Sequence, residues 1–447
     1  MRFTRRRRLA IPLAAAATIA LALTACTGDA APEDSGEAAD CSDYEAYGTF
    51  EDGAEVSFLG TPVDVEAERL QETFNDFTSC TGIEVTYTGT QEFEAQMRVL
   101  VDGNNAPDLA MFPQPGLFAT FADSFIPPSE QTVSNAQEYW SEDWQAFGTV
   151  DGELLGAPLM ASVKGFVWYS PSVWEENGWE VPTTLDELDT LTADIAASGV
   201  MMPWCAGFSS GEATGWPGTD WIEDYVLRQS GPEVYDQWVK HEIPFNDPQI
   251  VEAWDAVGDI LKNPEYVNGG LGDVRSINDV IFQEAGWPVT DGTCAMHHQA
   301  TFYEGLWPEG TTVAEDGDVW GFILPGTEAD ANAVTGAGEI VGAFRDAPEV
   351  QAVQDFLSSA EWANIRVKIG GTLSANNGVD PANASSALLA SAIEILQDEN
   401  TTFRFDASDL MPGAVGSDSF WKGIVAWIGG QDTQTTVDTI ESSWPAS

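Results

Sequence analysis

Residues 54–112 read AEVSFLGTPVDVEAERLQETFNDFTSCTGIEVTYTGTQEFEAQMRVLVDGNNAPDLAMF, and this stretch decides the fold class. Three of its segments are short and apolar, or alternate apolar with polar residues, as strands do: 54–60, 83–88 and 108–112. The two segments between them carry apolar residues at helical spacing: 65–79 and 93–101. This β-α-β-α-β order predicts an α/β fold, with a parallel sheet and helices on its faces.

The rest of the chain continues to mix strands with helices. We expect extended chain over 156–169 and strands over 292–297, 320–324 and 339–344. Helices are predicted over 184–198, 221–230, 247–263 and 348–363, and the last helix is expected to begin near Ser419.

The N-terminus has the layout of an export signal. Five arginines lie within the first eight residues, an apolar run follows from Leu9 to Leu23, and Thr24-Ala25-Cys26 comes next. Basic residues, then an apolar run, then small residues are typical of a secretory signal, and about 15 apolar residues are too few to span a membrane. A cysteine after Leu-Thr-Ala resembles the bacterial lipobox. This implies that residues 1–25 are removed and that Cys26 is lipidated.

Residues 26–53 are expected to hold the lipidated cysteine and a flexible tether, with the folded body starting near Cys41. Segment 27–40 reads TGDAAPEDSGEAAD and lacks aromatic and large aliphatic side chains. Such a segment cannot bury enough apolar surface to offset the entropy lost on ordering. The predicted location is therefore the extracellular face of the cell membrane, where a monomer is held by its lipid anchor.

Charge excludes one large class of partner. The 447 residues include 72 acidic and 17 basic ones, for a net charge of −55. A surface this negative repels phosphate backbones, so nucleic acid is excluded as a partner, and peripheral binding to anionic lipid is disfavoured. We interpret the acidity as an adaptation for solubility or salt tolerance, since no D-x-D-x-D-G calcium loop occurs. The length corresponds to two or more domains.

Four cysteines follow Cys26, and an even number in an exported chain predicts two disulfides with three alternative pairings. We favour Cys41–Cys80, which would fix the entry of the chain to the first helix, and Cys205–Cys294, which would join two strand edges. A metal site is the alternative. It has little support, because no Cys-x-x-Cys spacing occurs and there are only three histidines.

Six stretches, in order along the chain, resemble one family: the extracellular solute-binding lipoproteins of carbohydrate ABC importers, in the α-glucoside group. They are TYTGTQEFEAQM with GNNAPDLAMFPQPGL (86–97 and 103–117), KGFVWYSPSVWEENGWEVPTTLDEL (164–188), PWCAGFSSGEATGWPGTDWIEDYVLR (203–228), GTCAMHHQATF (292–302), GAGEIVGAF (336–344) and SFWKGIVAWI (419–428). The resemblance covers essentially everything after the tether.

This resemblance implies a two-lobed, periplasmic-binding-protein-like fold of type II, with a hinge and a ligand cleft between the lobes. Lobe 1 would hold residues 54–163 plus 328–375, and lobe 2 would hold 164–327 plus 376–447, with the first crossover near Lys164. The implied protein is a receptor and no enzyme. It would capture a sugar, an α-glucoside oligosaccharide, by hinge closure and deliver it to the membrane permease. No cofactor is expected, since other subunits of the importer would handle ATP.

Sugars present flat C–H faces and many hydroxyls, so a sugar site needs aromatic plates and polar groups around them. The aromatic candidates are Trp168, Trp216, Trp221 and Trp421, although most tryptophans in a chain with 17 of them pack in cores. The polar and backbone candidates follow predicted strands or lie where the resembling family contacts its ligand: Thr90, Gln91, Glu92, Gln114, Lys164, Asp220, Gln299, Thr301, Gly338 and Glu339.

Two enzymatic alternatives are weaker. Residues 207–211 read GFSSG and match the G-x-S-x-G elbow of serine hydrolases, but a helix-breaking stretch with Gly215 and Pro217 follows. A cell-surface glycoside hydrolase would need two carboxylates at a set separation, and 72 acids make that criterion uninformative. A carbohydrate-binding lipoprotein without a transport role is a third reading. His297 and His298 are adjacent in a predicted strand and point to opposite faces, so no metal site is expected.

Overall fold

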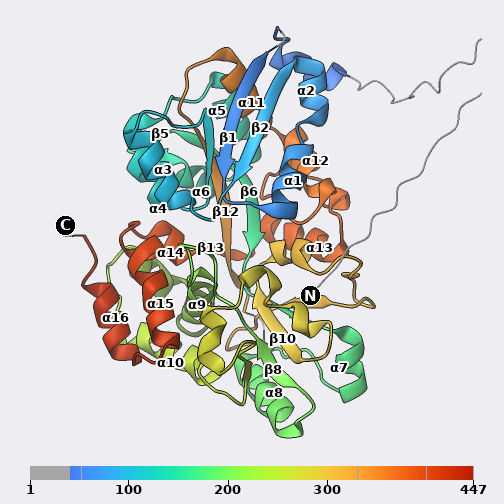
Figure 1. The fold of residues 1–447 in the computed structure, drawn as a ribbon, viewed down its shortest axis with the longest axis vertical. Coiled ribbons are helices and arrows are strands. Elements are labelled where there is room, and N and C mark those ends of the chain that lie inside the picture. The colour runs from blue at the N-terminus through green and yellow to red at the C-terminus, as the bar shows by residue number, and fades with distance from the viewer. Residues whose placement is uncertain (1–40, 52, 330, 399, 446–447) are drawn as a thin grey trace, which may run out of the picture. The chain divides into compact units, whose positions relative to one another are not determined.

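Two sheets, each with its own helices, organise the protein into two lobes (Figure 1). The computed structural model describes residues 41–51, 53–329, 331–398 and 400–445. The predicted signal segment 1–25, Cys26 and the tether up to residue 40 lie outside the described residues. None of the described helices combines the length and the apolar character needed to cross a membrane.

The first lobe is built on a six-stranded sheet of order β13-β12-β3-β1-β2, with β6 also paired to β12. The strands are β1 (Ala54–Gly60), β2 (Ile83–Gly89), β3 (Leu109–Phe112), β6 (Gly156–Val163), β12 (Ala333–Ala343) and β13 (Thr402–Phe405). Strand β1 is parallel to β2 and β3, as the β-α-β-α-β order predicts. Strand β12 is antiparallel to β3 and β6, so the complete sheet is mixed. The reason is that β12 enters from the other lobe, and no βαβ crossover sets its direction.

The second lobe has a five-stranded sheet of order β11-β7-β10-β8-β9. Its strands are β7 (Phe166–Tyr169), β8 (Met202–Cys205), β9 (Val267–Asn268), β10 (Cys294–Gln299) and β11 (Trp320–Ile323). Strand β10 is buried along its whole length, between β7 on one side and β8 on the other. A separate hairpin joins β4 (Thr149–Val150) to β5 (Glu153–Leu154).

Helices cover both sheets. Those of the first lobe are α1 (Asp64–Glu72), α2 (Asn75–Thr81), α3 (Phe93–Asp102), α4 (Pro115–Phe118), α5 (Glu130–Tyr139), α6 (Glu142–Phe147), α11 (Pro348–Leu357), α12 (Ala360–Ile369) and α13 (Ala387–Gln397). Those of the second lobe are α7 (Pro171–Asn177), α8 (Leu185–Ser198), α9 (Trp216–Val239), α10 (Pro248–Leu261), α14 (Ala407–Leu410), α15 (Trp421–Ile428) and α16 (Thr433–Glu441).

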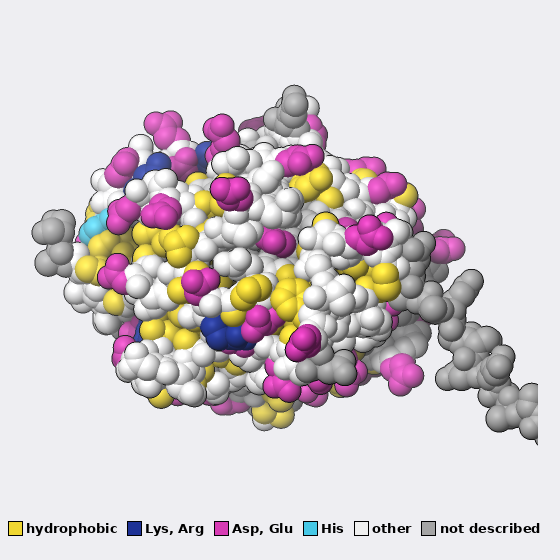
Figure 2. Space-filling model, turned by 90° about the horizontal axis from the view of Figure 1, so that it is seen from above, with side chains coloured by type: hydrophobic (Ala, Val, Ile, Leu, Met, Phe, Trp, Pro, Cys, Tyr) yellow, Lys and Arg dark blue, Asp and Glu magenta, His cyan; other side chains and the backbone are white. Residues whose placement is uncertain are grey.

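Short helical turns complete the chain: η1 (Cys41–Tyr47), η2 (Ala119–Ser124), η3 (Val274–Asn278), η4 (Phe282–Glu284), η5 (Trp287–Val289), η6 (Thr301–Leu306), η7 (Pro381–Asn383) and the π-helical η8 (Val415–Phe420). Figure 2 shows acidic side chains spread over one face of the molecule, with few basic ones among them.

Local hydrogen bonds divide two of the predicted helices. Predicted helix 65–79 is two helices, because the Thr73 hydroxyl donates to the carbonyl of Leu70 and interrupts the helical ladder. Predicted helix 348–363 divides where Ser359 caps α12 by accepting from the amide of Trp362. Helix α9 starts earlier than the predicted 221–230 and runs further, although its backbone breaks at Gly231, before Pro232.

The chain passes between the two lobes at three points within the described residues. The first crossover is Lys164–Gly165, between β6 and β7. The second runs over 324–332, from β11 to β12, and the third is Asp406, between β13 and α14. These crossovers define where the lobes meet.

Two segments bear on the predicted lobe boundaries. Residues 376–447 were expected in lobe 2; within them, β13 pairs with β12 of the first sheet. Leu388 and Leu389 of α13 lie in a core that also contains Trp168 and Tyr303 of lobe 2. The folded body was expected to start near Cys41, and η1 buries Tyr44 in that same core, which ties η1 to the folded body.

The structure joins Cys41 to Cys80 and Cys205 to Cys294, the pairing that the sequence analysis favours. The first bond links η1 to α2 and closes a loop with a sequence separation of 39. The second links the end of β8 to the start of β10, with a separation of 89.

Removal of the first disulfide should destabilise the first lobe. We expect the C41S/C80S variant to lose about 2–4 kcal/mol of unfolding free energy, because the unfolded chain regains loop entropy. Urea unfolding followed by tryptophan fluorescence measures this loss. Wild-type protein in excess reductant is the control, since it loses both bonds and should unfold at least as early. An unchanged midpoint for C41S/C80S in oxidising buffer would contradict the prediction.

Candidate ligand-binding site

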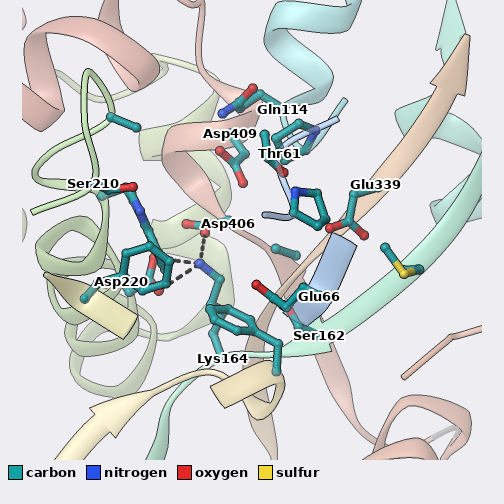
Figure 3. A pocket seen from close by; sticks show the side chains of 18 of the residues that line it. Thr61, Glu66, Gln114, Ser162, Lys164, Ser210, Asp220, Glu339, Asp406 and Asp409 are labelled. Carbon is teal, nitrogen blue, oxygen red and sulfur yellow. Dashed lines mark hydrogen bonds and ion pairs between the residues drawn. The ribbon is translucent and has the colours of Figure 1, made fainter. Parts of the chain in front are cut away.

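One cavity of about 190 Å³ collects side chains from both lobes (Figure 3). The first lobe contributes mainly polar groups: Thr61, Glu66, Gln91, Glu94, Gln114, Ser162, Glu339, Arg366 and Thr372. The second lobe contributes polar and aromatic groups: Ser210, Trp216, Thr219, Asp220, Phe282, Gln283, Phe302, Ser408, Asp409 and Trp421. Lys164 and Asp406, from the first and third crossovers, also line it. The cavity therefore lies where the lobes meet.

Part of the predicted ligand-contact set lines this cavity: Gln91, Gln114, Lys164, Trp216, Asp220, Glu339 and Trp421. These residues come from distant parts of the chain and meet because strand ends and crossovers share one edge of each sheet. The local fold allows close approach at Gly215, whose φ is +114°. A Cβ there would collide with the carbonyl oxygen of Trp421, so only glycine lets the start of α9 reach α15.

The predicted aromatic contacts Trp168 and Trp221 lie in the cores and do not line the cavity. Trp168 is fully buried in the first core, where its indole N–H donates to the carbonyl of Gln299. Trp221 packs in the second core against Trp204 and His298. Trp221 faces the core from α9, whose residues Trp216 and Asp220 line the cavity, whereas no residue of β7 lines it. Sequence position alone did not show which way either ring faces.

Five other predicted contacts do not line the cavity. The Thr90 hydroxyl accepts from the amide of Glu92, so both residues serve the turn before α3. The Gln299 side chain accepts from the amide of Ala300, and the Thr301 hydroxyl accepts from the amide of Val163. Gly338 faces a packed interior, where a Cβ would lie 2.5 Å from the ring of Trp144.

A buried cation with two carboxylates forms the floor of the site. The Lys164 ammonium lies 2.7 Å and 2.8 Å from the two oxygens of Asp220 and 2.7 Å from Asp406. Burial disfavours the charged ammonium, but Asp220 and Asp406 outweigh that cost and raise the pKa of Lys164 above its usual value. Burial raises the pKa of Asp220, and the Lys164 charge opposes it. Both oxygens of Asp220, one of the predicted polar ligand contacts, accept from Lys164 in this structure.

A second group of charges faces the first across the cavity (Figure 3). Burial raises the pKa of Glu66 to about 7, against the neighbouring charges of Arg366 and Arg69. Burial, together with the Glu66 charge, raises the pKa of Glu339 to about 7 as well. Glu94 accepts from the Gln114 amide at 2.8 Å. This wall is therefore rich in groups that accept hydrogen bonds.

Several polar atoms of the lining side chains have no hydrogen-bond partner among the described residues and are shielded from solvent. They are Gln114 Oε1, Gln283 Oε1, Asp406 Oδ1, Arg366 Nε and Trp421 Nε1. Buried polar atoms in native proteins are normally paired, so a cluster of unpaired ones in one cavity is typical of a site for a polar ligand.

Aromatic rings complete the cavity. Trp216 packs edge-on against Phe282, with ring centroids 4.9 Å apart, and Lys164 lies 4.9 Å from the Trp216 ring centre. Phe302 lies 6.1 Å from Trp216, and Trp421 also lines the cavity. Rings beside hydrogen-bonding groups can accommodate a ligand that has both flat apolar faces and hydroxyls.

The two adjacent histidines have separate structural roles. His297 Nδ1–H donates to the carbonyl of Cys205, and His298 Nε2–H donates to Asp224. Neither lines the cavity, and no cluster of His, Cys, Asp and Glu in the described part of the chain could hold a metal ion.

Sequence reasoning missed several lining residues: Glu66, Glu94, Ser210, Gln283, Phe302, Arg366, Asp406 and Asp409. Asp406 and Asp409 follow a short strand, the signal that had found Gln114, but β13 was not predicted. Glu66 and Arg366 lie on helices and reach the cavity from α1 and α12, a placement that only tertiary structure reveals.

Comparison with known proteins places the chain in a family. Residues 64–363 match the family model of bacterial extracellular solute-binding proteins. The chain is 38% identical over 400 residues to the osmoprotective compounds-binding protein GgtB of Synechocystis, which covers 88% of this chain and 93% of that one. It is 35% identical over 380 residues to the alpha-glucosides-binding periplasmic protein AglE of Rhizobium meliloti, covering 82% of each.

Solved structures share the fold. The maltose-bound MalE3 of T. maritima superposes with a TM-score of 0.69 at 16% identity, covering 87% of this chain and 98% of that one. The solute receptor AcbH gives a TM-score of 0.72 at 16% identity, with the same coverage. These likenesses confirm the predicted two-lobed fold. Together with the matched residues, they show that the chain belongs to the bacterial extracellular solute-binding protein family.

Proposed function

We propose that this protein is the substrate-binding receptor of a carbohydrate ABC importer and captures an α-glucoside between its lobes. The observation that carries the proposal is the cavity itself, where unpaired polar atoms from both lobes meet aromatic rings from the second lobe. The names of two relatives, which state binding of alpha-glucosides and of osmoprotective compounds, support a small polyhydroxylated ligand.

The proposed mechanism is hinge closure. Open and closed arrangements of the lobes are in equilibrium, and a ligand that contacts both lobes favours the closed one. The closed receptor would then dock on the membrane permease of the importer. Its proposed attachment is the lipid on Cys26, with the body outside the cell as a monomer.

Binding without chemical conversion fits the site better than catalysis. Ser210 of the GFSSG stretch lines the cavity, but no histidine lines it that could act as its base. The acids at the cavity are engaged with Lys164 or crowd one another in the wall that holds Arg366. We therefore assign no catalytic role to these residues.

We also propose revised lobe boundaries. Lobe 1 would comprise residues 41–163 and 333–405, and lobe 2 would comprise 166–323 and 407–445. The three crossovers would join the two lobes. The pairing of β13 with β12 and the packing of Tyr44 of η1 against Phe356 of α11 support this division.

Calorimetric titration with glucose, maltose, trehalose, sucrose and maltotriose tests the proposed function. We expect saturable one-to-one binding of at least one of these sugars, and recovery of that sugar unchanged by chromatography. Release of cleaved products would favour a hydrolase instead. No binding across the panel by folded protein would remove the α-glucoside proposal.

The aromatic rings of the cavity should contribute affinity. We expect W216A and W421A to weaken binding of the identified sugar by about tenfold or more, because each loses ring contact area against the sugar face. W287A is the matched control, since Trp287 is partly exposed outside the cavity. Equal affinities of all four proteins would contradict the assignment of these rings to the ligand.

Two glutamates that line the cavity, Glu66 and Glu339, should make the ligand-free protein less stable as pH rises. The pKa values of Glu66 and Glu339, raised by burial from 4.5 to about 7, mean that the folded state binds more protons than the unfolded state. Their stabilising contribution is complete below the unfolded pKa and is lost as pH rises through about 7.

We therefore expect the free energy of unfolding to fall by about 2–3 kcal/mol per residue between about pH 5 and about pH 8. Urea unfolding across this range measures it. E66Q and E339Q should flatten the dependence, whereas E68Q, at an exposed position on the same helix as Glu66, should not. A slope unchanged in E66Q would contradict the prediction.

A further inference from the structure

Three acidic residues of α9 contact the crossovers between the lobes or the residues that directly follow them. Asp220, Glu223 and Asp224 are spaced i, i+3, i+4, so they lie on one face of the helix. All three are buried, with exposed fractions of 4%, 1% and 0%. The apolar face of α9 packs in the second core, which fixes the helix within lobe 2. Buried carboxylates are rare unless each is paired, so the partners of these three define their role.

Glu223 binds the third crossover. Its Oε2 accepts from the amide of Ala407 at 2.8 Å, and its Oε1 accepts from the amide of Ser408 at 3.1 Å. Both amides belong to the start of α14, directly after Asp406. One carboxylate therefore holds the point at which the chain leaves the sheet of lobe 1 for the core of lobe 2.

Asp224 binds the start of β12, just after the second crossover, and packs against the first crossover. The Thr335 hydroxyl, at the start of β12, donates to its Oδ1, while His298 of β10 donates to its Oδ2 at 2.8 Å. Gly165, in the first crossover, has a φ of +72° and lies against this carboxylate. A Cβ at Gly165 would lie 2.7 Å from Asp224 Oδ2, so the crossover has no free space there.

Asp220 binds the first crossover through the Lys164 ammonium, and Lys164 in turn reaches Asp406 in the third. Backbone bonds tie the crossovers to one another. The amide of Lys164 donates to the carbonyl of Thr335 at 2.9 Å, and that of Leu324 donates to Gly165 at 2.7 Å. The amide of Asp406 donates to Gly336 at 2.8 Å. The three crossovers and α9 thus form one connected hydrogen-bonded unit, which we call the hinge clamp: Asp220, Glu223 and Asp224 with Lys164, Thr335 and residues 406–408.

We propose that Glu223 and Asp224 are positioning residues of the hinge, which set the balance between open and closed lobes without touching the ligand. Neither lines the cavity, whereas their clamp partners Lys164, Asp220 and Asp406 do. The inference rests on the proposed function, since it assigns a role within hinge closure.

The physical reason is geometric. Lobe rotation changes the backbone torsions of the crossovers, and the residues in or next to each crossover are bonded to a carboxylate on a helix of lobe 2. Any rotation therefore stretches or relaxes these bonds. A ligand that contacts Lys164 or Asp406 acts on the same bonded unit, which couples occupancy of the cavity to the hinge.

The test uses E223Q, D224N and, as a variant that retains every carboxylate, T335V. The side-chain amide introduced by E223Q would offer one acceptor and one NH₂ to two backbone N–H groups, so one bond to the third crossover is lost. T335V removes only the hydroxyl that binds Asp224. D355N is the control, because Asp355 accepts from Ser129 and Thr132 entirely within lobe 1.

The measurements are the radius of gyration by small-angle X-ray scattering, with and without the sugar identified by titration, and the Kd for that sugar. We expect E223Q and T335V to change the ligand-free radius of gyration and to shift Kd by about fivefold, while the ligand-bound radius stays that of the wild type. D355N should lower only the thermal midpoint.

Clamp variants that match D355N, with a lower midpoint but unchanged radius and Kd, would overturn the inference and leave the receptor function intact. If the wild type binds no sugar of the panel, the proposed function fails instead. The ligand-free radii of wild type and T335V still decide the hinge role in that case.

Discussion

The buried ammonium of Lys164 is the constraint on which the rest of the structure depends. Removing a charge from water is costly, and an unpaired one at this depth would be strongly destabilising. The carboxylates of Asp220 and Asp406 must therefore be brought to it, one from α9 in lobe 2 and one from the third crossover. Satisfying one cation fixes where two crossovers run, how α9 lies across the lobe boundary, and which wall of the cavity is charged.

The cavity brings carboxyl groups and cationic side chains together. Two cations, Lys164 and Arg366, face carboxyl groups from both lobes. Burial raises the pKa of several of these acids, so they exchange protons near neutral pH instead of remaining permanently charged. A neutral ligand with many hydroxyls suits such a wall, because hydroxyls donate to carboxylates and accept from carboxylic acids. A nucleotide or another phosphate-bearing ligand does not suit it, in keeping with a net charge of −55.

The sequence predicted the elements well and the faces of those elements poorly. Alternation over 54–60 and 83–88 is enough to predict β1 and β2, because a half-buried strand displays its period directly. Trp168 and Trp221 show the limit: an aromatic next to a crossover can point to the core or to the cleft, and only packing decides. Strand β13 shows a second limit, because the four residues Thr402–Phe405 are too few to display a period. Since this strand was not predicted, Asp406 directly after it was not predicted as a site residue either. Glu66 and Arg366 reach the cavity from helices whose docking no local pattern encodes.

Hydrogen bonds at the crossovers and apolar packing in the interior have different roles in this fold. Tryptophans are fully buried in both lobes, such as Trp362 in the first and Trp254 in the second. Such packing has one deep minimum and resists deformation. The crossovers are held by carboxylates, hydroxyls and backbone amides, whose hydrogen bonds are directional and can exchange for bonds to water or to a hydroxylated ligand at a small net cost. Under the proposed hinge closure, packed interiors joined by exchangeable bonds would let the ligand determine how far the lobes close.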